Sequence, residues 1–482
     1  MIKLKQISIA FLACGIAGCH LTDSHYVKPE VNAPLDWNSG QSNSNAVAMA
    51  DMAWWKQFND PVLNNMIEQA LANNNNIQVA IGNIEQAQAQ LEKAQRAWVP
   101  TASVMGGGFT GESFNQSLTP NTTSSSATPN MDFHGAFVGF VPSYSLNVFQ
   151  ILKNQEMAKA NLKIQKAAKN AVCLTVISQV AGGYFSLLGL KRQLELENKM
   201  VQDAIEIRKY TLIQIAQGSA SYVDLDRIDQ VLYMLSARTP SINGSIVQTQ
   251  NALQVLMNKN PSTLITHNSF EHIKTDGRIP VNLPSEVLKN RPDIQVSEYA
   301  MEASHVKIDL AMSQFFPNIL LTSPIARGSF DLNNLFSGST DFWATQVISS
   351  VPVLDLGIYA DIKASKASYY SAYYSYIQNV RNAFAQVDDG LSAYESANNV
   401  FKRQQKALNA AKNLYQSSVV KYKNGSGSYS GTLNYQLNVL NAELGLNQAK
   451  MNQLDSIVNL YQVLGGGYRA EKQLVKKQTI DY

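Results

Sequence analysis

Apolar residues recur every three or four positions through most of this chain, which is the spacing of one face of an α-helix. Asp60 and Pro61 open the first such stretch with a good N-cap and a good first helical residue. Prolines and glycines divide the remaining pattern into separate helices. Helices are therefore predicted at 60–98, 150–216, 223–257, 284–316, 357–422 and 432–464.

Between these helices the period becomes two, which indicates β-strands. In the stretch 136–148, Val138 and Phe140 face one way, while Gly139 and Ser143 face the other. Strands are predicted at 103–111, 136–148, 319–330 and 343–354.

The order of helix, two strands, long helix, glycine turn and helix occurs twice. Gly425 lies 207 positions after Gly218, and Pro352 lies 210 positions after Pro142. A tandem repeat explains this order most economically. The predicted organisation is a signal peptide (1–18), a lipidated linker (19–53), repeat 1 (54–258), a connector (259–284), repeat 2 (285–468) and a C-terminal tail (469–482).

The lengths of these elements predict an assembly. A helix of about 65 residues is about 100 Å long, which exceeds a single globular core and suits a coiled-coil tube. Four strands cannot close a membrane barrel, whose smallest members have about eight, and an open edge is not tolerated in lipid. The predicted fold is mainly α with a membrane β-barrel part: a long helical tunnel plus four strands per protomer, with a trimer forming a 12-stranded barrel. Trp98, Phe342 and Trp343 lie at strand ends, where they either anchor the barrel at the lipid interface or pack between helix and barrel.

The N-terminus has the anatomy of a signal peptide. Basic residues precede an apolar core at 7–13, and Ile16-Ala17-Gly18-Cys19 resembles a bacterial lipobox. Cys19 is thus the predicted lipidation site, and His20 after it favours the outer membrane. An ordinary secretory signal cleaved near Ala17 is the alternative.

Composition excludes several other classes. There are 39 Lys and Arg against 36 Asp and Glu, so the net charge of +3 gives no nucleic-acid footprint. No apolar run after the N-terminus approaches the roughly 20 residues of a membrane-spanning helix. Gly106–Gly111 fits G-x-G-x-x-G but precedes a polar loop, and the His267–His272 pair lacks a third ligand. Neither an enzyme nor a cofactor or metal site is expected.

Four motifs together resemble one family. These are Trp54-Trp55-x-x-Phe58-x-Asp60-Pro61-x-Leu63, Leu288-x-x-Arg291-Pro292-Asp293-Ile294, Pro352-x-x-Asp355-x-Gly357 and Leu464-Gly465-Gly466-Gly467-Tyr468. The chain resembles an outer-membrane factor of the TolC superfamily, in the lipoprotein branch typified by OprM and NodT. Asn147 and Gln150 depart from the Asp and Gly that family members often carry in the first repeat.

The resemblance implies a passive exit channel in the outer membrane that extends into the periplasm. The implied partners are two further copies, a periplasmic adaptor, an inner-membrane pump of the RND type and outer-membrane lipid, and the implied cargo is drugs, metals or other solutes. A type I secretion exit duct and a periplasmic coiled-coil structural lipoprotein without a pore are the alternatives.

The resemblance also implies roles for single residues. The adaptor would dock at the glycine turns, at Gly218, Gly425 and Gly427. The periplasmic gate would lie where these turns enter the inner helices. Its implied residues are Tyr422, Ser430, Asn434, Asp224 and Asp226, with Asn434 at a position where the family pattern has Asp. Asn434 facing a neighbouring helix is the alternative.

Overall fold

The structure, a computed structural model, describes residues 28–29, 31–32, 34, 36–37, 49–112, 132–264, 270–275, 289–329 and 340–470. The signal peptide, Cys19 and His267 lie outside these residues. The chain divides into two compact units. The sheet unit is Met1–Lys28, Gln86–Leu162 and Ala300–Ala372, and the helical unit is Pro29–Glu85, Lys163–Tyr299 and Tyr373–Tyr482.

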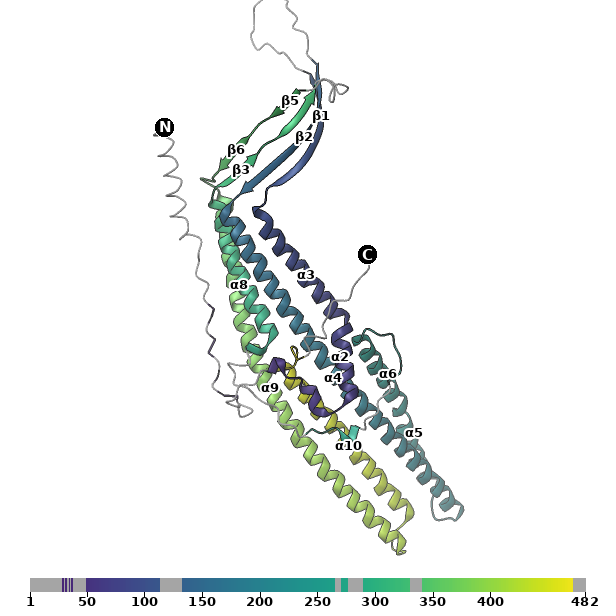
Figure 1. Cartoon of the computed structure of the whole chain (residues 1–482). Coiled ribbons are helices and arrows are strands. Elements are labelled where there is room, and N and C mark those ends of the chain that lie inside the picture. Colours follow the sequence, from purple (N-terminus) through teal and green to yellow (C-terminus); the bar gives the residue numbers. More distant parts are fainter. Residues whose placement is uncertain are drawn as a thin grey trace, which may run out of the picture. The chain divides into compact units, whose positions relative to one another are not determined.

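The sheet unit contains one antiparallel sheet that curls along its strands (Figure 1). Strand β2 is central, with β1 on one side and β3 and β4 on the other, and β6 and β5 pair with β3 and β4. The strands are β1 (Thr101–Glu112), β2 (Asp132–Leu146), β3 (Asn318–Thr322), β4 (Ile325–Ser329), β5 (Thr340–Trp343) and β6 (Gln346–Ser350). Gly106–Gly111 therefore belongs to a strand.

The strands predicted in the second repeat are each divided in two, yet their register is continuous. Tyr144 pairs with Leu321 before the gap, and Phe140 pairs with Ile325 after it. Both strands advance by four residues between these pairs, so the sheet behaves as four strands with a local interruption. The strand predicted to reach 354 ends at Ser350.

Prolines explain the interruption. Pro142 and Pro324 have no N–H to donate to the ladder. The Ser323 N–H still donates to the Pro142 carbonyl (3.1 Å), and the Ala344 N–H donates to the Pro324 carbonyl (3.1 Å). The Ser323 and Thr345 hydroxyls add a bond of 3.0 Å. Missing donors on adjacent strands thus weaken the ladder along one line across the sheet.

The helices in the described part of the chain follow the predicted order. They are α2 (Pro61–Asn73), α3 (Asn75–Gln95), α4 (Val148–Ala216), α5 (Tyr222–Ser236), α6 (Arg238–Leu256), α8 (Pro292–Met312), α9 (Leu356–Lys423) and α10 (Tyr429–Val463). The helix predicted at 60–98 breaks at Asn74, because the Asn74 side chain accepts from the Ile77 N–H (3.3 Å) and donates to the Leu256 carbonyl (2.8 Å). The helix predicted at 223–257 breaks at Ala237.

Asn147 and Val148 were wrongly assigned to a strand. Val148 opens α4, and the Asn147 carboxamide oxygen accepts from the Gln150 N–H (3.0 Å) as a helix cap. The carboxamide N–H of Asn147 also donates to the Ser313 carbonyl (3.2 Å). Asp355 caps α9 in the same way through the Gly357 N–H (2.8 Å), but a carboxylate offers no such donor.

In the core of the helical unit, the segment before α2 packs against the segment at the end of α10. The Trp54 ring stacks on Tyr461, with centroids 4.8 Å apart, and the Gly467 N–H donates to the Met49 carbonyl (2.8 Å). Gly467 has a φ of +90°, and a Cβ there would lie 2.7 Å from the Trp55 ring. The end of the predicted linker is therefore core, since Met49 is fully buried.

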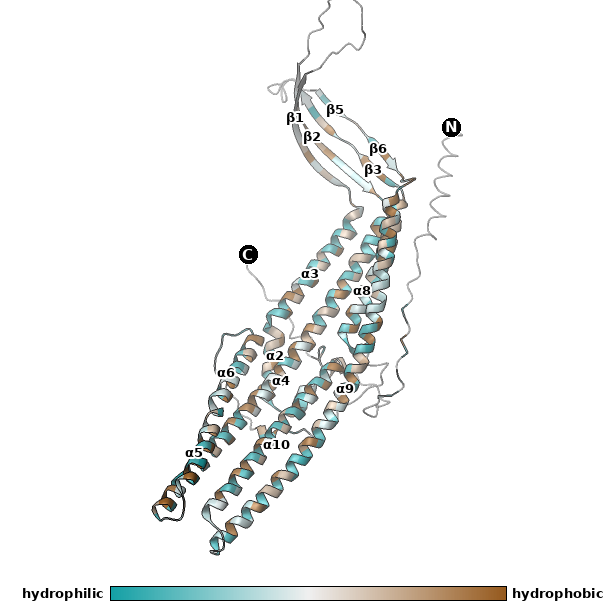
Figure 2. Cartoon of the chain, turned by 180° about the vertical axis from the view of Figure 1, so that it is seen from behind, coloured by the Kyte–Doolittle hydropathy of each residue, from teal (hydrophilic) through white to brown (hydrophobic). Residues whose placement is uncertain are grey.

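Helix α4 contributes more buried side chains to this core than any other helix in the described part of the chain. It contains a window of 18 residues that is long and apolar enough to span a membrane, with a mean hydropathy of 1.6. Of that window, 61% is buried inside the protein. The sequence prediction that no such run exists was therefore too strict, but burial identifies this window as a core helix. Figure 2 shows hydrophobic and hydrophilic residues alternating along α4, α9 and α10.

Asp60 connects the start of α2 to α4. Its carboxylate accepts from the Val62 N–H (2.9 Å) and the Leu63 N–H (3.2 Å), and it accepts from the Tyr184 hydroxyl at 2.6 Å. Burial first, and then the Asp60 carboxylate, raise the pKa of the Tyr184 hydroxyl, which therefore stays protonated and able to donate.

Replacing Asp60 with alanine removes the cap and leaves a buried hydroxyl without its acceptor. We expect Asp60→Ala to lower the free energy of unfolding by about 2 kcal/mol, measured by urea unfolding followed by circular dichroism. Asp60→Asn is the matched control, because its oxygen can still accept, and it should lose less than half as much. Equal stability of the wild type and Asp60→Ala would contradict this role.

Candidate functional site: the helix turns and the two faces of the sheet

The turn after α4 closes the helix with a left-handed glycine. Gly218 has a φ of +68° and its N–H donates to the Ile215 carbonyl (3.0 Å). The Ser219 N–H donates to the Gln214 carbonyl (2.8 Å), which completes a Schellman motif. A Cβ on Gly218 would meet nothing within 4 Å, so backbone conformation rather than crowding requires glycine here.

The turn after α9 repeats this geometry 207 positions later. Gly425 has a φ of +73°, and the Ser426 N–H donates to the Lys421 carbonyl (2.9 Å). Gly427 differs, because a Cβ there would lie 3.2 Å from the Lys421 Cβ. Its counterpart in the first turn is Ala220, so the second turn is the tighter one.

The helices that follow the turns are capped differently. The Ser221 hydroxyl accepts from the Asp224 N–H (3.3 Å), and the Asp224 carboxylate accepts from the Ser221 N–H (3.0 Å), which forms a capping box. Ser428 caps α10 through the Gly431 N–H (3.1 Å), but Gly431 has no carboxylate to return the bond. The Ser221–Asp224 bonds, and then Arg227, hold the pKa of Asp224 below its ordinary value.

The structure places the predicted gate residues on two separate helix starts. Asp224 lies in the first turn of α5 and Asp226 two residues later, and Ser430 and Asn434 lie near the start of α10. Asp226 and Asn434 are exposed, whereas Ser430 is half-buried. In the described part of one protomer, no hydrogen bond or ion pair joins the two acids to Ser430 or Asn434. Asp224 is engaged in capping its own helix.

Tyr422, the remaining predicted gate residue, belongs to an aromatic cluster that the sequence did not reveal. The Tyr429 ring lies 5.4 Å from Tyr422 and 5.0 Å from Tyr210. These tyrosines come from α9, α10 and α4, so the start of α10 connects both long helices near the turns. The pattern Tyr-x₆-Tyr across a glycine turn is the only signal in the sequence, and it does not identify a partner on α4.

Two polar bridges add to this connection. The Gln436 side chain donates to the Asp203 carboxylate (2.8 Å) and accepts from the Tyr415 hydroxyl (3.1 Å). Burial first, and then Glu206, raise the pKa of Asp203, although the Gln436 bond opposes the shift. Arg208 on α4 pairs with Asp229 on α5 at 2.5 Å.

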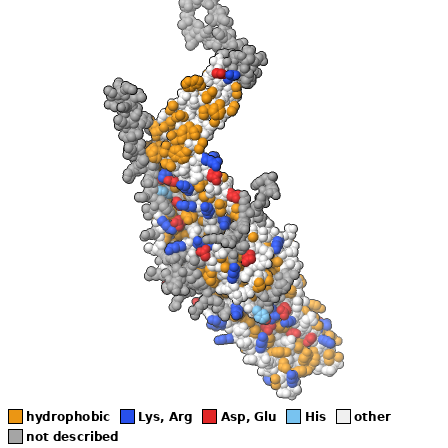
Figure 3. Space-filling model, viewed as in Figure 1, with side chains coloured by type: hydrophobic (Ala, Val, Ile, Leu, Met, Phe, Trp, Pro, Cys, Tyr) orange, Lys and Arg blue, Asp and Glu red, His pale blue; other side chains and the backbone are white. Residues whose placement is uncertain are grey.

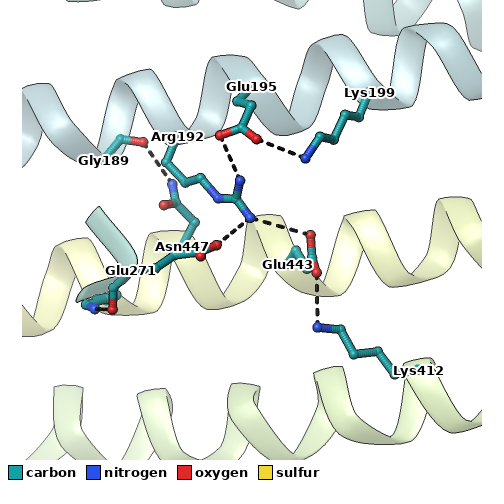
Figure 4. A network of polar contacts seen from close by, with 9 residues as sticks. Gly189, Arg192, Glu195, Lys199, Glu271, Lys412, Glu443 and Asn447 are labelled. Atoms are coloured by element: carbon teal, nitrogen blue, oxygen red, sulfur yellow. Dashed lines mark hydrogen bonds and ion pairs between the residues drawn. The ribbon is translucent and has the colours of Figure 1, made fainter. Parts of the chain in front are cut away.

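A larger network lies further along the same helices (Figure 4). Arg192 on α4 pairs with Glu195 (2.8 Å) and with Glu271 (2.5 Å) of the short 3-10 helix η4 (Phe270–His272). Lys412 on α9 pairs with Glu443 on α10 (3.2 Å). The network borders a cavity of about 300 Å³, and it attaches the predicted connector to the long helices.

The register of the sheet separates two chemically different faces, since paired residues share a face and successive residues alternate. We call one the apolar face. It carries Val104, Phe140, Tyr144, Leu146, Ile319, Leu321, Ile325, Trp343 and Val347. Val104 and Trp343 are each 76% exposed. Figure 3 shows hydrophobic side chains covering the face of the sheet in view.

The opposite face, which we call the small-residue face, contains no charged residue among the described strand side chains. It carries Ser103, Gly107, Gly139, Ser143, Ser145, Thr322, Ala326, Gly328 and Gln346 alongside Met105, Phe137, Leu320, Phe342 and Ile348. A Cβ on Gly139 would lie 2.5 Å from the Ala326 Cβ, so this face is crowded, as expected for the concave side of a curled sheet. The three aromatic residues considered as lipid anchors are separated: Phe342 lies on this face, Trp343 lies on the apolar face, and Trp98 lies in a 3-10 helix before β1.

The model of the family described as "Outer membrane efflux protein" matches residues 66–259 and again residues 283–466. The chain belongs to the outer membrane efflux protein family. The apolar face has the alternation that is typical of the lipid-facing side of outer-membrane barrel strands.

Similar proteins agree with this family over nearly the whole chain. The probable efflux pump outer membrane protein TtgC of Pseudomonas putida is 26% identical over 483 residues, which cover 98% of each chain. The cation efflux system protein CusC of Escherichia coli is 28% identical over 473 residues, covering 95% of this chain and 98% of CusC.

Solved structures of outer membrane channels share the fold. CmeC of Campylobacter jejuni superposes with a TM-score of 0.79 at 22% identity, over 94% of this chain and 98% of CmeC. The open state of MtrE of Neisseria gonorrhoeae gives a TM-score of 0.79 at 24% identity, over 93% of this chain and 98% of MtrE. The predicted fold class is confirmed.

The capping box makes the start of α5 sensitive to acid. The pKa of Asp224 is lowered in the folded protein, so its ionised carboxylate stabilises the start of α5 fully above the ordinary pKa of Asp, about 3.9. This stabilisation is lost as the pH falls through the lowered pKa. We expect amide exchange at 222–226, corrected for intrinsic rates, to accelerate over that fall in pH. Residues 429–433 are the internal control, since Gly431 cannot titrate, and Asp224→Asn should abolish the effect. Equal acceleration in both segments would refute it.

Proposed function

We propose that this chain is the passive exit duct of a tripartite efflux system. In this proposal three copies form a channel that works with a periplasmic adaptor and an inner-membrane RND-type pump, which supplies the energy. The exported solutes are drugs, metals or other small molecules. The repeats at 54–258 and 285–468 each contribute one helix–strand–strand–helix half.

The strands carry this proposal. The sheet in one copy has an apolar face for lipid and an uncharged small-residue face for a water-filled lumen. Its edges are β1 on one side and β5 with β6 on the other, and neither edge is paired in the described part of one protomer. Unpaired backbone groups in lipid cost several kcal/mol each, so the edges must pair with other copies. Three copies supply twelve strands.

We place adaptor docking at the glycine turns. Next to Gly218, Tyr222 is 71% and Val223 66% exposed, so large apolar side chains lie at the surface of the first turn. In the second turn, Gly425 and Gly427 are exposed and have no side chains of their own to cover the backbone. Exposed aromatic anchors beside accessible backbone suit a protein partner.

We place the gate at the starts of α5 and α10. Threefold symmetry would turn each side chain there into a ring of three. Rings of Asp224 and Asp226 would attract cations, whereas a ring of Asn434 amides would hydrogen-bond without charge. The exposure of Asn434 in one protomer agrees with a position on the channel axis.

Substitution of the turn glycines tests docking. We expect Gly218→Val and Gly425→Val to abolish drug resistance in a susceptibility assay, since a β-branched residue resists a positive φ, while trimers still form. Gly218→Asn is the matched control, because Asn tolerates this conformation, and it should retain most resistance. Normal resistance in both valine variants would refute docking at these turns and the export role assigned to them.

A single substitution tests the gate. We expect the wild-type channel to be weakly blocked by divalent cations from the periplasmic side, and Asn434→Asp to create a strong block in single-channel recordings. Asn434→Gln is the neutral control. Strong wild-type block that survives Asp224→Asn and Asp226→Asn would show that the gate lies elsewhere.

Mass spectrometry of the mature N-terminus tests the lipid anchor at Cys19. We expect an acylated cysteine as the first residue, because several acyl chains anchor a protein firmly. Cys19→Ala should slow processing yet leave some channel function, since the barrel is a separate anchor. An unmodified residue at position 18, 19 or 20 would exclude lipidation there.

A further inference from the structure

Two charged side chains interrupt the apolar face. Arg327 on β4 and Asp341 on β5 are direct partners in the register. The Arg327 Nε lies 2.6 Å from the Asp341 Oδ1, and its Nη2 lies 3.0 Å from Oδ2, so the pair is bidentate. Among the described strand side chains of this face, these are the only charged ones. A bidentate pair holds the planar guanidinium in one orientation.

The pair lies one row beyond Ile325 and Trp343, on the side of that row away from the start of α4. Arg327 pairs with Val138, and Leu146 ends β2 beside α4, while β1 and β2 continue beyond Val138 to Glu112 and Asp132. Eight residues at about 3.4 Å each separate these rows by about 27 Å along the strand. A barrel tilt of about 40° reduces this separation to about 20 Å along the membrane normal, close to the roughly 25 Å height of a lipid-facing apolar band.

Charge energetics favour the same position. Arg on a lipid-facing strand costs about 2–4 kcal/mol at the midplane and about 0–1 kcal/mol near the interface. Trp343 and Ile325 form the next row toward α4, and aromatic residues typically border the apolar band. With the helices in the periplasm, Arg327 therefore lies at the headgroups of the outer leaflet.

The ion pair uses only some of the N–H donors of Arg327. A guanidinium has five N–H donors, and the two bonds to Asp341 use two of them. The Arg327 side chain is 44% exposed, so its remaining donors are accessible. Phosphate oxygens fit the fork of arginine best. The carboxylate offsets the charge of Arg327 within the apolar face and fixes its direction.

We propose that Arg327, oriented by Asp341, binds the phosphate of a lipid headgroup in the outer leaflet, with one site per protomer, and thereby sets the depth of the barrel in the membrane. The proposal rests on the proposed function only in requiring a barrel with its helices on the periplasmic side. Arg327 is on the apolar face and not on the small-residue face that lines the proposed lumen, so its substitution should not affect conductance or drug resistance.

Lipid binding to the purified trimer tests the site, with lipid A as the probe. We expect native mass spectrometry to show preferential binding of bisphosphorylated over dephosphorylated lipid A. Arg327→Leu leaves Asp341 unpaired in lipid and can prevent insertion, so Arg327→Leu/Asp341→Leu is the main variant. It should lose about tenfold in affinity for the phosphorylated form, as expected for a charged hydrogen bond. Asp341→Asn should keep or raise that affinity, and Lys406→Leu on α9 is the control.

Trp343 gives an independent measure of depth. In a Trp98→Phe background, brominated lipids should quench Trp343 at a different depth in Arg327→Leu/Asp341→Leu than in the parent protein. Inorganic phosphate should not displace lipid A, because the acyl chains supply most of its affinity. Equal binding of phosphorylated and dephosphorylated lipid A, or an unchanged quenching profile in the double variant, would overturn the proposal. A wild-type trimer without conductance would instead contradict the channel function.

Discussion

The backbone hydrogen bonds of one sheet constrain this molecule more than any side-chain contact. In lipid, no water can satisfy an open strand edge, so the edges at β1 and at β5 with β6 require partners. The hydrogen bonds of the sheet are maintained even where prolines interrupt them. Pro142 and Pro324 remove donors from adjacent strands along one line, and the Ser323 and Thr345 hydroxyls add a bond at that line. The register survives, and with it the separation of the apolar face from the small-residue face.

The two halves of the chain differ in the side chains that cap corresponding helices. Both glycine turns have the same Schellman geometry, but Asp224 completes a capping box that Gly431 cannot form. Asn147 and Asp355 both cap a long helix, yet only Asn147 donates a second bond to a neighbouring segment. The two halves thus share the backbone geometry of the glycine turns and differ in the side chains that cap the helices.

Local rules predicted most of the fold, because helix periodicity, strand alternation and glycine turns leave their signal in neighbouring residues. Asp60 and Gly218 were identified this way with their structural roles. Contacts between distant segments were not predictable: no local pattern joins Tyr210 to Tyr429 or Trp54 to Tyr461. The strand assigned through Val148 failed because alternation continued into the cap of α4. The Ser221–Asp224 capping box could have been predicted from the three-residue spacing of Ser and Asp, but it was missed. The gate positions remain predictions.

Cross-linking between strand edges tests the closed barrel most directly. Within one protomer β1 and β6 are separated by β2 and β3, about 14 Å, which is too far for a disulfide. In a Cys173→Ser background, Ser103→Cys on β1 is combined in turn with Gln346→Cys, Ile348→Cys or Ser350→Cys on β6, all on the small-residue face. Oxidation of the membrane-inserted protein should give covalent trimers on a denaturing gel for at least one combination and none for single-cysteine variants. Only monomers in every combination, from protein that has inserted, would contradict the account.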